Sequence, residues 1–361
     1  MIKTAKTLVT ETYDPYRNLA VESCLLDSLR PDECILYLWQ NAKTVVIGRN
    51  QNAYRECRIE KLTADGGRLA RRGSGGGSVY HDMGNLNFTF LANEGDYDVA
   101  RQLSVIVRAL EGFGVSAEIS GRNDITADGR KFSGNAYYRH KGRCYHHGAI
   151  LVDTDMTKMS EYLRVSAEKL RTHGVESVRS RVVNLRELQP AIGIGAMKAA
   201  LIRAFGEVYD VATSPMNPDD LDREALAGWQ DRYASAEWLY GRHMRADYTF
   251  GRRFSWGEVE ICLAVQGETI TDALVFSDAM DGDIAEVLTG RFVGLPFRAT
   301  ALLDALDATQ GKHAAQGEAG EYAAQAKAGA ESADAVQAES EAEPRVLRDI
   351  MDLIKEQDIW R

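Results

Sequence analysis

The densest group of chemically useful residues is a glycine-rich segment at residues 71–82, which reads RRGSGGGSVYHD. Three consecutive glycines, Gly75 to Gly77, permit positive backbone torsions and a close approach of a ligand to the main chain. Their N–H groups can surround an anion, and the preceding arginine pair offers planar donors for a carboxylate or phosphate. The segment lacks the Gly-Lys-Ser/Thr ending of a P-loop, so it predicts an anion site of another kind, with a flexible surface loop as the alternative.

A second group surrounds a lysine. Residues 121–124 read GRND, and residues 131–136 read KFSGNA, with the turn signal Asp128-Gly129 between them. Lys131 is therefore expected on a strand among small and polar residues. A cation held there can pair with a phosphate or polarise a carbonyl oxygen, whereas a lone lysine is more often a solvated surface cation.

A third group is the histidine pair in the segment YHHGAILVD at residues 145–153. Adjacent residues of a strand face opposite ways, so His146 and His147 are not expected to share one metal ion. The five cysteines are odd in number and none is spaced C-x-x-C, which argues against a disulfide framework and a structural zinc site. His147, expected at the start of a strand, is a secondary candidate for the site.

Hydrophobic periodicity predicts the elements that must position these groups. Helices are expected over residues 17–29, 99–113 and 196–209, and strands over 35–39, 44–47, 117–119, 124–126 and 147–153. Directly after the glycine-rich segment, Leu86, Phe88 and Phe90 alternate with polar residues and predict one more strand. Later, residues 253–265 and 269–276 have strand patterns, and residues 345–357 have a helical one. The chain is thus long enough for two domains, which we place at 1–247 and 248–361.

Composition limits the class of protein. The formal net charge of −10 disfavours a nucleic-acid binder. No apolar run approaches the roughly 18 residues of a membrane helix, and the first ten residues do not form a signal peptide, so a cytoplasmic protein is expected, without a membrane partner. Residues 311–344 contain no Leu, Ile, Phe, Met or Trp, which predicts a disordered insertion or a transient helix.

Further segments stand in register with these three groups. They are YDP at 13–15, NLAVE at 18–22, TVVIGRNQN at 44–52, SGRND at 120–124 and SVRSRV at 177–182. Together with the glycine-rich segment through Asn85, KFSGNA and HHG, they cover most of residues 11–190, and this part of the chain resembles the lipoate–protein ligase A family. A weaker likeness continues through FSWG at 254–257.

The resemblance implies a fold and an activity. The fold would be α/β (α+β), with a large biotin/lipoate ligase-like catalytic domain of mixed sheets and flanking helices and a small C-terminal α+β domain. The activity would be an ATP- and Mg²⁺-dependent ligation. Lipoate is activated to lipoyl-AMP and transferred to a lysine of an apo lipoyl domain, either of a 2-oxoacid dehydrogenase acyltransferase subunit or of the glycine cleavage H protein.

The resemblance also assigns roles to residues. Lys131 would contact the α-phosphate and the lipoate carboxylate and act in catalysis, and Arg72 would bind the anion. Asp124 would be a partner for nucleotide, lysine or Mg²⁺, and Val46 and His147 would line a slot for the lipoate tail. The full set expected around ATP or the adenylate is Arg72, Ser74, Gly75, Gly76, Gly77, Ser78, Val79, Tyr80, Asn123, Asp124 and Lys131.

Two other readings compete with this one. An octanoyltransferase or lipoyl amidotransferase of the same fold would use a cysteine nucleophile and no ATP. Cys144 is the candidate, because the neighbouring Arg143 and His146 could lower the pKa of its thiol. A non-catalytic lipoate-binding protein is the other reading, and the retention of Arg72, the glycines and Lys131 argues against it.

Overall fold

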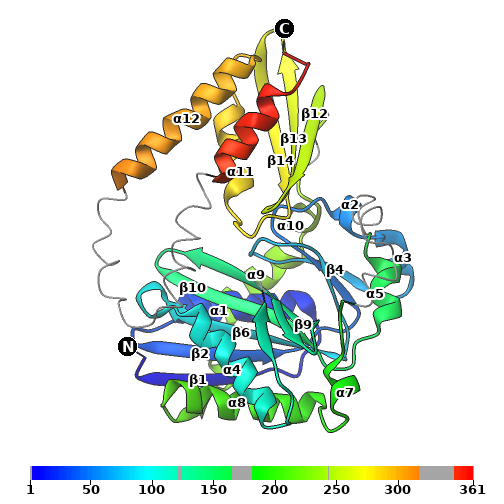
Figure 1. Cartoon of the computed structure of the whole chain (residues 1–361), viewed down its shortest axis with the longest axis vertical. Helices are drawn as coiled ribbons and strands as arrows, with labels where there is room; N and C mark the ends of the chain where they lie inside the picture. The colour runs from blue at the N-terminus through cyan, green and yellow to red at the C-terminus, as the bar shows by residue number, and fades with distance from the viewer. Residues whose placement is uncertain (1, 121–123, 165–180, 243, 317–344, 361) are drawn as a thin grey trace. The chain divides into compact units, whose positions relative to one another are not determined.

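The structure is a computed structural model that describes residues 2–120, 124–164, 181–242, 244–316 and 345–360. The chain separates into two compact units, Met1–Gly241 and Arg242–Arg361 (Figure 1). Among the described residues, every helix is too short or too polar to span a bilayer.

An eight-stranded mixed sheet in the order β11-β1-β2-β6-β10-β9-β8-β7 forms the base of the first unit. Strand β1 pairs in parallel with β11 and β2, and the remaining pairs are antiparallel. The strands are β1 (Thr4–Val9), β2 (Glu33–Trp39), β6 (Asn85–Asn93), β7 (Glu118–Ser120), β8 (Asp124–Ala127), β9 (Arg130–His140), β10 (Arg143–Leu151) and β11 (Thr213–Pro215).

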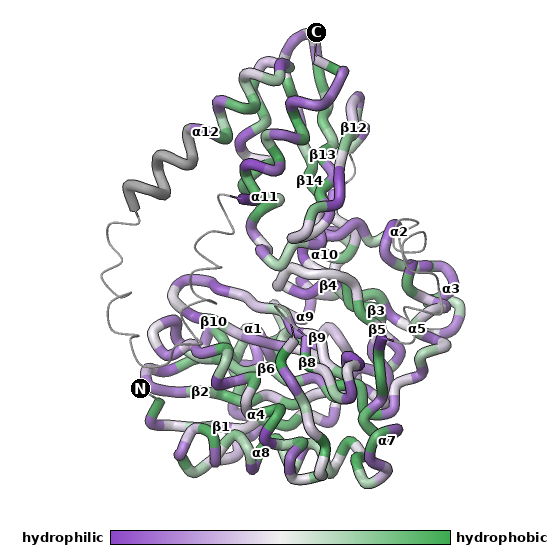
Figure 2. The backbone as a smooth tube through the Cα atoms, viewed as in Figure 1, coloured by the Kyte–Doolittle hydropathy of each residue, from purple (hydrophilic) through white to green (hydrophobic). Residues whose placement is uncertain are grey.

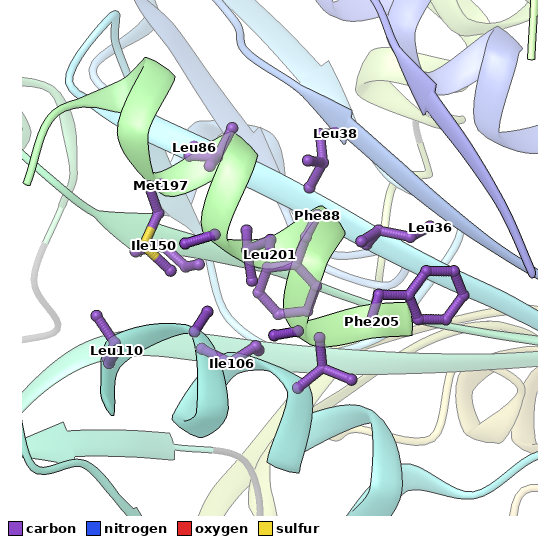
Figure 3. Packing of buried hydrophobic residues seen from close by; sticks show 14 of the residues in the cluster. Leu36, Leu38, Leu86, Phe88, Ile106, Leu110, Ile150, Met197, Leu201 and Phe205 are labelled. Carbon is purple, nitrogen blue, oxygen red and sulfur yellow. The ribbon is translucent and has the colours of Figure 1, made fainter. Parts of the chain in front are cut away.

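Helices cover both faces of this sheet. On one face, α4 (Val99–Glu111) and α8 (Ile194–Tyr209) bury an apolar core against the central strands. Figure 3 shows Ile106 and Leu110 of α4 and Leu201 and Phe205 of α8 meeting Phe88 of β6. On the other face lie α1 (Pro15–Ser28) and α9 (Arg223–Ala234), with a second apolar cluster between them and the sheet. The even-numbered residues of β6 face the first core and the odd-numbered ones the second.

Helix α1 begins where its sequence provides a cap. The side chain of Asp14 accepts hydrogen bonds from the N–H groups of Tyr16 and Arg17, and Pro15 occupies the first turn, where it has no helical partner to lose. This start fixes the rotation of α1, so that Asn18 and Glu22, one turn apart, are both buried towards the sheet.

A small sheet in the order β4-β3-β5 carries the glycine-rich segment. Strand β3 (Thr44–Ile47) pairs in parallel with β4 (Arg68–Arg71) and antiparallel with β5 (Val79–His81). Strands β2 and β3, consecutive in the chain, belong to different sheets, so residues 40–43 connect the two sheets. The remaining short elements are α2 (Ala53–Glu56), α3 (Ile59–Ala64), η1 (Glu94–Asp96), α5 (Met156–Tyr162), α7 (Leu185–Leu188), η2 (Pro218–Asp220) and α10 (Ala236–Tyr240).

The second unit is a three-stranded antiparallel meander covered by helices. Its strands are β12 (Tyr248–Phe254), β13 (Gly257–Gln266) and β14 (Thr269–Ser277), and its helices are α11 (Ile284–Phe292), α12 (Ala299–Gln316) and residues 345–355. One strand pattern had been expected over 253–265, but a turn at Ser255-Trp256 divides it between β12 and β13. Figure 2 shows hydrophobic and hydrophilic residues alternating along α11, whose buried side chains join the core of this unit.

The expected fold class is confirmed as a large mixed sheet with flanking helices and a small C-terminal α+β unit. One boundary was wrong, because β10 begins at Arg143 and His147 lies in mid-strand. Of the low-complexity segment 311–344, residues 311–316 continue α12, and residues 317–344 lie outside the described part of the chain.

Candidate functional site

The glycine-rich segment is a tight loop between the last residue of β4 and the first of β5. Gly76 has a φ of +86°, which a residue with a side chain rarely adopts. A Cβ at Gly48, after β3, would lie 2.1 Å from the carbonyl oxygen of Gly76. The loop therefore packs directly on the backbone of the strand between its two ends, and glycine is needed on both sides of that contact.

The side chain of the first arginine, Arg71, binds backbone carbonyl groups of the protein itself. Arg71 is buried, and its guanidinium donates to the carbonyl oxygens of Arg49 (2.8 Å), Gln51 (2.7 Å) and Leu239 (2.8 Å). Burial lowers its pKa to about 10. Arg71 thus ties β4 to the segment after β3 and to α10, which is a structural role.

Arg72 organises the loop itself. Its Nη2 donates to the carbonyl oxygens of Gly75 (2.6 Å) and Gly77 (2.8 Å), and its Nε donates to Ser74 Oγ (3.0 Å). Its acceptors in the described residues are neutral, and burial lowers its pKa to about 10, opposed by nearby Glu22. Within the described chain, the N–H groups of Gly75, Gly76 and Gly77 donate to no acceptor; Gly75 and Gly76 are buried, and Gly77 is exposed. Unbonded N–H groups of successive residues are a feature of anion sites.

A buried polar chain continues from this arginine. Ser74 Oγ lies 2.7 Å from His147 Nε2, and His147 Nδ1 lies 2.8 Å from Glu22 Oε1. Thr89 Oγ1 donates to the same Glu22 oxygen at 2.7 Å. We call Arg72, Ser74, His147, Glu22 and Thr89 the Arg72 cluster. Its last four members connect the loop to α1, β6 and β10, so the Gly-rich loop is anchored to the large sheet.

Lys131 and Asp124 form an ion pair on strands β9 and β8. Lys131 Nζ lies 2.6 Å from Asp124 Oδ1, and each side chain is 36% exposed. We call these two residues the Lys131 pair. Lys131 also bonds through its main chain to Arg181 and Val183, which adds a short parallel bridge to β9.

A bulge decides which way Lys131 faces. The register of β8 with β9 shifts between Ile125 and Thr126, so that Phe132 is an extra residue buried in the first core. Lys131 then faces the same side as Gly134, and a Cβ on Gly134 would come within 2.9 Å of Lys131 Nζ. The lysine side chain lies over this glycine, and an alanine there would displace it.

Strand register places both groups on one face of the sheet. One row runs Trp39–Asn87–Ala149–Gly134–Asp124 across β2, β6, β10, β9 and β8. The neighbouring row contains Thr89, His147 and Ala136. Ala149 and Gly134 are half-exposed although they lie on central strands. Two small residues, Ala149 and Gly134, therefore line the sheet face between the Arg72 cluster and the Lys131 pair. We call them the small-residue floor.

The other expected residues fall in different places. Val46 is buried in the second core and Tyr80 in a cluster with Tyr162, while Val79 and Gly77 are exposed on the loop. Ser78 Oγ donates to Glu56 at 3.0 Å. Asn123 lies outside the described residues.

The structure does not support Cys144 as the nucleophile of the competing acyl-enzyme reading. Its side chain is fully buried, and burial raises the pKa of its thiol to about 11, an effect that nearby Arg139 only partly opposes. On β10 it alternates with Tyr145 and His147, so it belongs to the face opposite the Arg72 cluster. The local sequence Arg-Cys-Tyr-His suggested a reactive thiol, but burial determines its chemistry.

Sequence reasoning missed Glu22 and Asn87. Each of these polar residues is 1% exposed. Each lies on the side of its helix or strand that faces the protein interior. The signal for Glu22 was an acid on the apolar side of a helix, between Leu19 and Leu26. Asn87 occupies a position on a central strand at which an apolar residue is the norm.

No set of three or more His, Cys, Asp or Glu side chains converges as a metal site among the described residues. Asp124 is a half-exposed carboxylate beside the small-residue floor. A Mg²⁺ ion, which is usually held by one or two carboxylates together with substrate phosphates, fits such a single carboxylate. A surface hollow of about 480 Å³ lined by Tyr13, Asp14, Ala42, Lys43, Gly66 and Arg68 contains none of the site residues.

Comparisons with known proteins find related structures. The structure of P. falciparum LipL1 in complex with lipoate is 26% identical, with a TM-score of 0.75, over 84% of this chain and 94% of that one. The bi-partite lipoate protein ligase of Thermoplasma acidophilum, described with its E2 lipoyl domain, is 29% identical, with a TM-score of 0.60, over 68% and 100%. A lipoate-protein ligase A bound with ATP is 28% identical, with a TM-score of 0.57, over 67% and 99%.

The family assignment rests on the sequence as well. Residues 14–206 match the lipoyl protein ligase A/B catalytic domain, and residues 243–321 match the bacterial lipoate protein ligase C-terminus. The first match spans the glycine-rich loop, the Arg72 cluster and the Lys131 pair. The chain therefore belongs to the lipoyl protein ligase A/B family and carries the bacterial lipoate protein ligase C-terminal domain.

Proposed function

We propose that this protein activates lipoate with ATP and transfers the lipoyl group from lipoyl-AMP to a lysine of an acceptor lipoyl domain. The observation that carries the proposal is that a loop with unbonded N–H groups and a partly exposed lysine lie on the same face of the large sheet. In this assignment the unit Met1–Gly241 carries the chemistry and Arg242–Arg361 is an accessory domain.

The first step joins two anions. A carboxylate oxygen of lipoate attacks the α-phosphorus of ATP, the bond from that phosphorus to the bridging oxygen breaks, and pyrophosphate leaves with the electron pair. Negative charge gathers on the oxygens around phosphorus, where fixed positive groups have their largest effect. The N–H groups of Gly75 to Gly77 bind phosphate oxygens, and Lys131 exchanges Asp124 for the α-phosphate and the carboxylate.

Magnesium, when bound with the nucleotide, neutralises phosphate charge, and Asp124 is the protein carboxylate that would hold it. Release of Asp124 from Lys131 makes both groups available at once: the lysine for the reacting oxygens and the aspartate for the cation. The buried Arg72 keeps the loop carbonyls turned inwards, which leaves the N–H groups directed to the ligand.

The second step transfers the acyl group. The amine nitrogen of the acceptor lysine attacks the lipoyl carbonyl carbon, the carbon–oxygen bond to AMP breaks, and AMP leaves while the amine loses a proton. Lys131 can stabilise the developing negative oxygen in this step too. A relative described with its E2 lipoyl domain supports a lipoyl domain as the acceptor. The acceptor in this proposal is a 2-oxoacid dehydrogenase acyltransferase subunit or a glycine cleavage H protein.

The test is exchange of labelled pyrophosphate into ATP, measured with and without lipoate. We expect exchange that depends on lipoate and persists in Cys144→Ala, because that thiol is buried on the opposite face. Absence of exchange, together with acyl transfer that is lost in a folded Cys144→Ala protein, would point to a cysteine acyl-enzyme. Binding of lipoate with neither reaction would indicate a non-catalytic lipoate-binding protein.

A further inference from the structure

A buried amide on the sheet face has no partner. Both polar atoms of the Asn87 side chain, Oδ1 and Nδ2, are fully buried and form no hydrogen bond. Asn85, two residues earlier on the same face, at least accepts a hydrogen bond from the N–H of Asp82. An amide without any partner in a core is disfavoured, so it indicates a group that arrives from outside.

The position of Asn87 shows where such a group would come from. Its neighbours across the strands are Trp39 and Ala149. The indole Nε1 of Trp39 already donates to Thr89, and Ala149 has no polar side chain. Beyond Ala149 the same row reaches Gly134, over which Lys131 lies. The Asn87 amide therefore lies at one end of the small-residue floor, and Lys131 lies at the other end.

Distances along the row match the acyl substrate of the proposed reaction. Two strand spacings separate β6 from β9, about 10 Å. This is comparable with the length of an extended acyl chain of lipoate's size. With the carboxylate at Lys131, a tail laid along this row would cross Gly134 and then Ala149, and its far end would come to the Asn87 and Trp39 end of the row.

We propose that Asn87 is a specificity residue that recognises the ring sulfurs at the far end of the lipoyl chain and so disfavours a plain fatty acyl chain of equal length. This inference rests on the proposed function. An amide N–H can donate to a sulfur, a weak acceptor, whereas a terminal methyl group leaves the amide dry and unpaired. Octanoate therefore leaves the amide as it is in the ligand-free protein, and the discrimination comes from the hydrogen bond that lipoate alone can accept.

The experiment compares lipoate with octanoate in wild type and in Asn87→Leu, which keeps a similar volume without polar atoms. Both acids are used in the pyrophosphate exchange assay, and their binding is measured by calorimetry. We expect the ratio of kcat/KM for lipoate over octanoate to fall about tenfold, because lipoate binding is weakened and octanoate binding is not. Thermal unfolding should show that the variant is folded.

Ser133→Ala is the matched control. Ser133 Oγ is also buried and forms no hydrogen bond. In the sheet, however, Ser133 stands beside Ile150 and Ile125, on the face opposite Asn87, so loss of its hydroxyl group should not change the ratio. An unchanged ratio in Asn87→Leu would overturn the inference, and so would an equal loss for both acids, which would place Asn87 at the shared carboxyl end. A wild-type protein without lipoate-dependent exchange would instead refute the proposed function.

Discussion

The two charged groups on the sheet face are built in opposite ways. In the Arg72 cluster, every side chain is buried to 8% exposure or less and each is held by at least one hydrogen bond to another member. In the Lys131 pair, both side chains are 36% exposed and one ion pair joins them. The first group is fixed before a substrate arrives, and the second can rearrange when it does.

This difference predicts different consequences of mutation. A half-exposed ion pair contributes little to stability, so its loss should be seen in catalysis. A buried hydrogen-bonded group leaves its partners unsatisfied when it is removed, so its loss should be seen in stability first.

The largest effect is expected at Lys131. Lys131→Ala should lower lipoate-dependent pyrophosphate exchange by about 10²–10³-fold, because a positive group is lost where negative charge develops. The free energy of unfolding should change by less than about 1 kcal/mol. Lys131→Arg should restore only part of the rate, since a planar guanidinium differs in shape from an ammonium group. Near-normal rates in Lys131→Ala would show that this lysine is a surface cation.

Glu22→Ala should break the Arg72 cluster from within. It removes the acceptor of both Thr89 and His147 and the negative charge near Arg72, so we expect a loss of about 2–5 kcal/mol in urea unfolding. Glu22→Gln, which keeps an acceptor oxygen, should lose less. If Glu22→Ala is as stable as wild type, the cluster does not hold the loop.

Substitution of two glycines tests whether stability depends on the loop itself or on the backbone against which the loop packs. Gly48→Ala would push a methyl group against the Gly76 carbonyl and should cost about 1–3 kcal/mol. Gly77→Ala, where a Cβ would meet open space, should leave stability unchanged and raise the KM for ATP if the nucleotide passes there. Equal stability of the two variants would contradict the packing described here.

Acid should destabilise the buried region of the first unit. Burial, as the main cause, lowers the pKa of both His81 and His146 to about 3. Below pH ~6.5 an unfolded chain protonates these histidines and the folded one does not, so stability falls as pH drops from about 6.5 towards 3, by roughly 1 kcal/mol per pH unit for each residue. Urea unfolding at pH 7 and 5 measures this, and His146→Gln should flatten the dependence.

Much of this arrangement could be predicted from sequence, because glycines, turn signals and hydrophobic periods act locally. The Asp128-Gly129 turn is where expected, with positive φ at both residues. The buried hydrogen bonds that join α1 to β10 and the loop could not be predicted, since they depend on tertiary contacts between residues far apart in the chain. The same limit explains why Arg71 and Arg72, identical and adjacent in sequence, contact different groups.

Orientation was the other limit. The bulge at Phe132 turns Lys131 onto the site face, and a regular two-residue alternation would have placed it on the other side. The lowered thiol pKa that the competing reading required of Cys144 is absent for a related reason, because neighbours in sequence are poor guides to burial.

The central claim, attack of the lipoate carboxylate on the α-phosphorus of ATP, can be tested by oxygen transfer. Lipoate labelled with ¹⁸O in its carboxylate is incubated with the enzyme, ATP and an acceptor lipoyl domain, and the AMP released is examined by mass spectrometry. The account predicts one labelled oxygen in AMP, because the attacking oxygen stays on phosphorus when the acceptor lysine takes the acyl group. Lipoylated acceptor formed with unlabelled AMP, or without AMP, would contradict it.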